Sequence, residues 1–177
     1  NRAIGRLATE HLLAQGARQV GVVTGPADWW EAQQRLSGWR QALEAFGLDV
    51  DESLVSAGDW SAESGRLAGE ALLQRHPTLD AVFASNDQMA LGVMFAAHRL
   101  GRRIPDDLAV VGVDNIPESD LFWPPLTSIR QRLREAGAQA VSLVDSLIAA
   151  TGEEPVPQAV TSTVLQPELI VRASTRP

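Results

Sequence analysis

The stretch 79–101 constrains the fold most, because its hydrophobic pattern changes period part-way along. Residues 81–84 are a short apolar run, which predicts a buried strand. Three polar residues follow this run: Ser85, Asn86 and Asp87. Apolar residues then recur at helical spacing, at Met89, Val93, Ala96 or Ala97, and Leu100. A buried strand therefore leads into a helix, and the polar cluster lies at the carboxyl end of the strand, where open parallel sheets bind ligands.

The polar cluster also has a simpler interpretation. Ser85 or Asn86 could cap the helix, and Asp87 could complement the helix dipole. One polar residue is enough for a cap, and three are present here. Ligand binding therefore stays open beside capping.

Strands and helices alternate along the first two thirds of the chain. The predicted strands lie at 19–24, 54–56, 81–84 and 108–113. The predicted helices lie at 3–14, 36–46, 61–76 and 89–100. Such alternation predicts right-handed crossovers and an α/β fold, with a mostly parallel sheet flanked by helices on both faces.

The pattern changes after residue 115. Residues 127–131 are predicted to be extended, and a longer helix is predicted at 133–147, followed by a linker at 153–157. The apolar stretch 164–171 is interrupted by Pro167. Since proline cannot donate to a strand ladder, this stretch can form only an edge strand or a broken strand.

Composition excludes several classes of protein. The chain has 177 residues, of which 45% are hydrophobic, enough for a globular domain with a real core. The net charge of −7 argues against a polyanion-binding surface, and there is no cysteine for disulfides or thiolate metal sites. No apolar run approaches the ~20 residues of a membrane span. Because the chain starts at Asn1 with no leader pattern, we expect it to be part of a longer protein.

Each of the four predicted strands runs into polar or aromatic residues. These are Asp28-Trp29-Trp30, Asp59-Trp60, Asn86-Asp87 and Asp114-Asn115. In a parallel sheet, the four ends lie on one rim. Carboxylates and amides offer paired acceptors and donors to vicinal hydroxyls, and an indole can pack on the apolar face of a sugar ring. The rim therefore predicts a carbohydrate site, with plain packing as the alternative role of the tryptophans.

Catalysis is the weaker interpretation of the same rim. Acidic side chains could hold Mg²⁺ for phosphoryl transfer, but the chain has no Walker A loop, no G-x-G-x-x-G, no H-E-x-x-H and no G-x-S-x-G. The histidines His11, His76 and His98 have no acid or serine partner by spacing. We predict that Trp39 is a core residue, because it shares a helical stripe with Leu36 and Leu43.

Six segments occur in an order that points to a known family. They are Arg35-Leu36-Ser37-Gly38-Trp39, Gly58-Asp59-Trp60-Ser61, Asn86-Asp87-Gln88-Met89-Ala90-Leu91-Gly92, Ile104-Pro105-Asp106-Asp107-Leu108, Val111-Gly112-Val113-Asp114 and Pro124-Pro125-Leu126-Thr127-Ser128-Ile129-Arg130-Gln131. The chain resembles the lactose-repressor/galactose-repressor family of bacterial transcription regulators, from residue 1 to about Arg172.

This resemblance implies a periplasmic-binding-protein-like fold of two α/β lobes with a small effector between them. By this resemblance, residues 1–127 and 160–177 form the C-terminal lobe. Residues 132–150 form a helix of the N-terminal lobe. The DNA-binding head and the first half of the N-terminal lobe are absent from these residues, so we expect operator DNA to be bound only through that missing head.

The resemblance also implies the residues that contact the effector: Arg35, Trp60, Asn86, Asp114 and Gln131. It implies no metal and no cofactor. The expected partners are a sugar-like effector and a second copy of the chain, without a membrane, and the expected location is the cytoplasm. The chain departs from the family pattern at Val113, where an aromatic is usual, at Asn115, and in the bulky Trp29-Trp30 pair.

Two functions from different classes follow. The first is the effector-binding and dimerisation region of a repressor, in which effector binding shifts the lobe arrangement and passes this bias to DNA affinity. The alternative is a sugar receptor of an ABC transporter, which shares the fold. An enzyme with Asp114 or Asp87 as a catalytic residue is a third and weaker hypothesis. The fold alone cannot distinguish these three functions.

Overall fold

The computed structural model describes residues 1–149 and 164–175. Six strands form one sheet in the order β2-β1-β3-β4-β5-β6. The strands are β1 (Val20–Thr24), β2 (Val55–Ala57), β3 (Ala81–Ala84), β4 (Ala109–Val113), β5 (Thr127–Arg130) and β6 (Glu168–Ile170). The first five are parallel to one another, and β6 runs antiparallel to β5 at the edge. The predicted parallel sheet and the edge position of the segment that follows Pro167 are confirmed.

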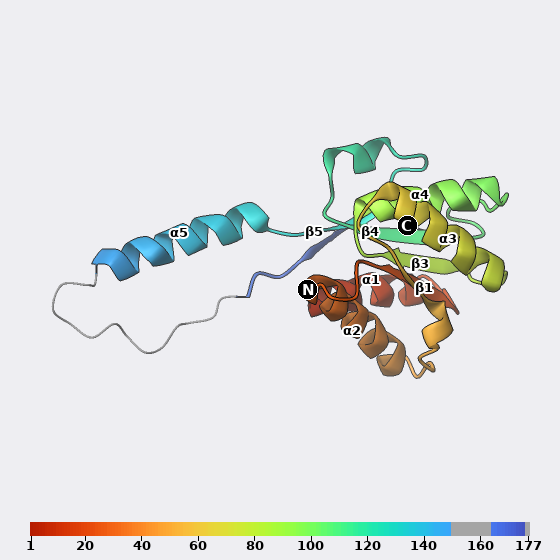
Figure 1. The fold of residues 1–177 in the computed structure, drawn as a ribbon, viewed down its shortest axis with the longest axis horizontal. Coiled ribbons are helices and arrows are strands. Elements are labelled where there is room, and N and C mark those ends of the chain that lie inside the picture. Colours follow the sequence, from red (N-terminus) through yellow and green to blue (C-terminus); the bar gives the residue numbers. More distant parts are fainter. Residues whose placement is uncertain (150–163, 176–177) are drawn as a thin grey trace.

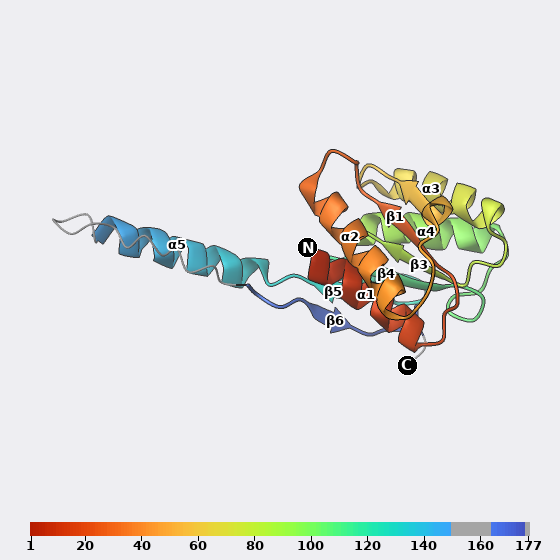
Figure 2. The same cartoon turned by 90° about the horizontal axis from the view of Figure 1, so that it is seen from below.

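Helices cover both faces of this sheet, as predicted (Figure 1). The helices are α1 (Arg2–Ala14), α2 (Trp30–Ala45), α3 (Ala62–Arg75), α4 (Asp87–Arg99) and α5 (Leu133–Ala149), with short 3-10 turns η1 (Glu52–Leu54) and η2 (Pro117–Leu121). Helices α1 and α2 pack together on one face, and α3 and α4 pack together on the other (Figures 1 and 2). Trp30 starts α2, so the loop after β1 is shorter than the sequence suggested.

Glycines let the paired helices approach closely. A Cβ on Gly38 would lie 2.1 Å from the carbonyl oxygen of Arg2, and a Cβ on Gly92 would lie 2.0 Å from that of Ala62. Both contacts are shorter than any real Cβ makes, so each helix pair crosses with backbone against backbone. These crossings fix the two helices that carry the polar residues at the sheet edge.

The central strands form the core. All described residues of β1 and β3 are buried, and Trp39 is 0% exposed. The Nε1–H of Trp39 donates to the carbonyl oxygen of Val20 at 3.0 Å, which satisfies its polar group inside the core. The predicted core role of Trp39 is therefore confirmed.

Helix α5 stands apart from the main body, which comprises residues 1–130 and 168–175 (Figures 1 and 2). None of its residues is buried, and several large apolar side chains are exposed along it: Leu133, Val141, Leu143, Val144, Leu147 and Ile148. The predicted linker at 153–157 lies outside the described residues. No helix in residues 1–149 and 164–175 combines the length and apolarity needed to cross a bilayer.

Candidate functional site

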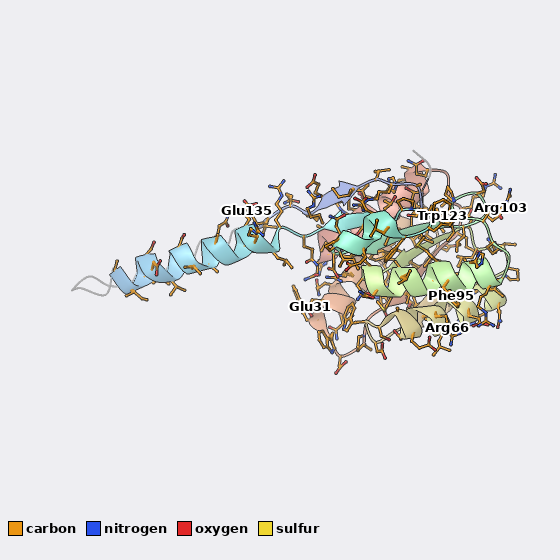
Figure 3. The ribbon with its side chains drawn as sticks, turned by 90° about the horizontal axis from the view of Figure 1, so that it is seen from above. Glu31, Arg66, Phe95, Arg103, Trp123 and Glu135 are labelled. Carbon is orange, nitrogen blue, oxygen red and sulfur yellow. The ribbon has the colours of Figure 1, made fainter. Side chains whose placement is uncertain are left out.

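The carboxyl ends of four parallel strands meet at one edge of the sheet, on the side from which α5 extends (Figure 1). A hollow of about 320 Å³ lies at this edge. Its lining comes from the starts of α2 and α4 and from the ends of β2 and β4: Trp29, Glu31, Arg35, Trp60, Asn86 and Asp114. We call it the rim hollow. Figure 3 shows Glu31 on this side of the main body.

Arg35 is 5% exposed and turns inward from α2. Its Nη1 donates to the carbonyl oxygen of Ser85, and its Nε donates to Oδ1 of Asn1 at 3.1 Å. Burial lowers the pKa of Arg35, while Asp114 and Glu31 act in the opposite direction. A guanidinium fixed in this way presents its remaining N–H groups to the hollow in a fixed geometry.

Trp60 follows β2 with a φ of 75°, a left-handed conformation that is strained for a bulky residue. A Cβ on Gly25 would lie 2.1 Å from the Trp60 ring, so Gly25 provides the room that the ring occupies. The Arg35 Cζ lies 5.7 Å from the ring centroid, within the range of a cation–π contact. The buried Nε1 of Trp60 has no partner among the described residues, although buried polar groups are normally hydrogen-bonded.

The side-chain amide of Asn86 has a structural role and also keeps one donor and one acceptor site unused. Its Oδ1 accepts from the Met89 backbone N–H at 2.8 Å, which caps α4, and its Nδ2 donates to the Trp60 carbonyl oxygen at 2.9 Å. An amide has two N–H donors and two acceptor lone pairs, and these bonds use one of each. Capping and a place in the rim hollow, which the sequence left as alternatives, are therefore combined in one residue.

Asp114 follows β4, and Gln131 follows the neighbouring strand β5. The Nε2 of Gln131 donates to Oδ1 of Asp114 at 2.7 Å. Asp114 has an exposed side chain, yet enough protein surrounds its carboxyl group that desolvation raises its pKa, which Gln131 and Arg35 oppose. Gln131 does not line the rim hollow, so it reaches the site through Asp114.

Several residues predicted on the rim have structural roles instead. Asp87 is 0% exposed and accepts from the Ile116 N–H and from the hydroxyls of Ser119 and Ser128. Burial is the main cause of its raised pKa. As the first residue of α4, Asp87 turns back over the sheet, so the rim placement and the catalytic hypothesis were wrong for this side chain.

The side chains of Asn115 and Asp59 also accept hydrogen bonds from other residues of the protein. Oδ1 of Asn115 accepts from Nη2 of Arg172 at 2.8 Å, and Oδ1 of Asp59 accepts from the Ser61 backbone N–H at 2.9 Å. Both side chains therefore stabilise loops at the sheet edge, and neither lines the rim hollow.

Glu31 lines the hollow but was not predicted. It lies four residues before Arg35 on α2, so both side chains project from the same face of the helix. That spacing was visible in the sequence and could have identified it. Trp29 also lines the hollow, and its ring meets Trp60 edge-to-face, with centroids 5.7 Å apart and planes inclined at 63°.

In residues 1–149 and 164–175, no three His, Asp or Glu side chains come together as metal ligands would. His11 pairs with the Thr175 hydroxyl at 3.0 Å, and His76 contacts Ser53, both away from the rim hollow.

The family model described as "Periplasmic binding protein-like domain" matches residues 9–175 of this chain. The chain belongs to this family. Its curated relatives are transcriptional regulators of the LacI type, and the resemblance derived from the six segments is confirmed.

One relative, the HTH-type transcriptional regulator CelR of Thermobifida fusca, is 39% identical over 170 residues, covering 96% of this chain and 48% of the relative. The ribose operon repressor of Halalkalibacterium halodurans is 41% identical over 144 residues, covering 81% of this chain and 43% of the relative. The chain therefore spans about half the length of these relatives.

Two solved structures have the same fold. One is described as a complex of the transcriptional regulator CelR with cellobiose, with a TM-score of 0.88 and 39% identity, covering 98% of this chain and 51% of that one. The other is described as a lac repressor dimer bound to operator and the anti-inducer ONPF, with a TM-score of 0.85 and 32% identity. This match covers 98% of the present chain and 58% of the lac repressor chain. The predicted periplasmic-binding-protein-like fold is confirmed, and the chain is an effector-binding regulatory domain of this type.

Proposed function

We propose that the rim hollow binds a small sugar and that this chain gives a LacI-type repressor its effector response. The observation that carries the proposal is the constellation around Trp60. One hollow brings the Trp60 indole together with an acidic acceptor, Asp114, a fixed guanidinium, Arg35, and the Asn86 amide, which still has one donor and one acceptor site open. Donors and acceptors of this kind match vicinal hydroxyls, and an indole matches the C–H face of a sugar ring.

The individual groups have capacity left for a ligand. Oδ1 of Asp114 accepts from Gln131, and no described residue donates to Oδ2. The buried Nε1 of Trp60 also has no partner in the described part of the chain. Unpaired polar groups at a site are costly unless a ligand or water completes them. A polyol effector supplies both the hydroxyl donors and the acceptors that these atoms need.

In this proposal the rim hollow is one wall of a cleft between two lobes. Residues 1–127 and 160–177 belong to the C-terminal lobe, and the helix at 132–150 belongs to the N-terminal lobe. The exposed apolar side chains of α5 support this assignment, because a helix with so much apolar surface normally packs on another element. Gln131 lies where the chain leaves β5 for α5, at the predicted crossover.

The effector then acts by selecting one lobe arrangement. A ligand shifts a two-state equilibrium only by its differential affinity for the two states. We propose that the parent protein is a cytoplasmic homodimer that binds operator DNA through a separate head. The relatives are regulators, which favours this function over the transport-receptor alternative and over an enzyme. The lac repressor structure is described as a dimer bound to operator.

Calorimetric titration of the full-length protein with mono- and disaccharides tests the proposal. Asp114→Asn should weaken binding at least tenfold, because hydrogen bonds to charged groups are worth about 1.5–3 kcal/mol. Asp28→Asn is the matched control, since Asp28 is exposed and does not line the hollow. An unchanged dissociation constant for folded Asp114→Asn would remove Asp114 from the site. A wild-type protein that binds none of the sugars would refute the sugar proposal.

A further inference from the structure

Trp29 lines the rim hollow but has no role in the single-ring sugar site proposed around Trp60. Its side chain is 51% exposed, although burial in a core is where an indole stabilises a fold most. Trp29 is the N-cap residue of α2, and its side chain makes no capping hydrogen bond there. Serine, threonine, aspartate or asparagine would serve this position better. The position of Trp29 therefore contributes little that the fold requires.

The two indoles of the hollow are inclined to each other. The rings of Trp29 and Trp60 meet edge-to-face, with an interplanar angle of 63°. A pyranose ring has one mean plane, so a single ring cannot lie flat against both indoles. Each indole needs a ring of its own for face-to-face packing. Two sugar rings joined by a glycosidic bond can satisfy this, because rotation about that bond inclines one ring to the other.

The polar groups are divided between these two positions. Arg35 lies against the Trp60 ring, Asn86 donates to the Trp60 carbonyl oxygen, and Asp114 lines the same hollow from the end of β4. Glu31 is in the first turn of α2, two residues after the exposed Trp29, and both residues line the hollow. Its carboxylate gives the Trp29 side of the hollow a hydroxyl acceptor. Figure 3 shows Glu31 on the side of the main body from which α5 extends.

From this geometry we infer that the effector is a disaccharide or longer glycoside, whose first ring packs on Trp60 and whose second ring packs on Trp29 beside Glu31. This inference rests on the proposed sugar-binding function and makes Trp29 the residue that determines ligand length. Trp29 can be substituted without unfolding the domain, because a half-exposed side chain at a helix start contributes little to stability.

Trp30 supplies a matched control. It is the next residue, it is 58% exposed, and it does not line the rim hollow. Trp29→Ala and Trp30→Ala therefore remove the same chemical group from neighbouring exposed positions. Trp29→Phe keeps an aromatic face at the proposed second-ring position and serves as a rescue variant.

The experiment is calorimetric titration of the full-length protein and these variants with cellobiose, maltose, lactose and glucose, the monosaccharide unit that all three disaccharides contain. We expect the wild type to bind at least one disaccharide about tenfold more tightly than glucose. Trp29→Ala should weaken disaccharide binding much more than glucose binding, and so remove most of this advantage. Trp29→Phe should restore most of it, and Trp30→Ala should change neither affinity.

Two results would overturn the inference while leaving the sugar site intact. One is a wild type that binds glucose as tightly as every disaccharide. The other is a Trp29→Ala variant, folded by circular dichroism, that binds the preferred disaccharide normally or loses glucose affinity equally. If the wild type binds none of the four sugars, the proposed sugar-binding function fails first, and this inference fails with it.

Discussion

The buried carboxylate of Asp87 should be one of the most sensitive positions in this domain. Oδ2 accepts from the Ile116 backbone N–H at 2.9 Å and from the Ser119 hydroxyl at 2.6 Å. Oδ1 accepts from the Ser128 hydroxyl at 2.6 Å. One side chain therefore joins the start of α4 to η2 and β5, the segment that follows Asp114.

The cost of Asp87→Ala follows from the three donors that it leaves. The two serine hydroxyls can rotate toward other acceptors, but the Ile116 N–H is fixed by the backbone. A buried donor without a partner costs about 1–3 kcal/mol, and hydrogen bonds to charged groups are each worth about 1.5–3 kcal/mol. Allowing for rotation of the hydroxyls, we expect Asp87→Ala to lower the free energy of unfolding by about 3–5 kcal/mol. This is a large part of the about 5–15 kcal/mol typical of a domain.

The pH dependence of stability gives a second signature. Burial raises the pKa of Asp87 above the ordinary aspartate value of about 3.9, despite the hydrogen bonds from Ser119 and Ser128. Between these two pKa values the folded state binds more protons than the unfolded state. The contribution of Asp87 to the free energy of unfolding is therefore full below the ordinary value and falls as pH rises to the raised one. Asp87→Asn should abolish this fall.

Urea unfolding of the full-length protein, followed by circular dichroism between about pH 4 and pH 7, measures both effects. Asp28→Ala is the control, because Asp28 is exposed in the loop before α2, and its midpoint should shift little. A loss of less than about 1 kcal/mol in a cooperatively unfolding Asp87→Ala variant would show that the three donors find other partners.

Three further predictions concern packing, the site and the chain as a whole. Gly92→Ala should destabilise the domain by several kcal/mol in urea unfolding, because its Cβ would lie 2.0 Å from the Ala62 carbonyl oxygen; a neutral change would mean that α3 and α4 can separate freely. Trp60→Ala should abolish the fluorescence change on sugar binding, whereas a lowered melting temperature with normal affinity would make Trp60 a packing residue. Residues 1–177 alone should bind sugar far more weakly than the full-length protein and self-associate through the apolar side chains of α5, as measured by titration and sedimentation; a monodisperse monomer with full-length affinity would contradict the lobe assignment.

The spacing of hydrophobic residues along the chain was enough to predict most of the fold. Few arrangements can bury both the apolar runs of β1, β3 and β4 and the apolar stripes of the helices between them. The alternation of strands with helices then predicts a parallel sheet. The edge position of β6 followed from Pro167 alone. The start of α2 at Trp30 was missed, because a tryptophan pair lacks the usual capping signal.

The site was harder to predict, because a polar residue at a strand end can turn either way. Asp87 and Asn86 are neighbours in sequence, yet Asn86 lines the rim hollow and Asp87 points into the core. The serines that hold Asp87 are 32 and 41 residues away, so local pattern gives no sign of them. The position of Arg35 could not be predicted from the local pattern either, because the Ser85 carbonyl that it binds is 50 residues away in the sequence. Only the family resemblance indicated that Arg35 turns inward.

Backbone strain in this domain is concentrated where the ligand is proposed to bind. Among the described residues, the non-glycine positions with positive φ are Trp60, Asp114 and Asn115. Asn86 holds the carbonyl of Trp60, the Ile129 carbonyl holds the N–H of Asp114, and the Ser128 hydroxyl holds the N–H of Asn115. Such conformations persist only when the surrounding structure over-determines them, and they lower the ordering cost of binding. Because Ser128 also binds Asp87, the core network that stabilises the fold also fixes the backbone of the site.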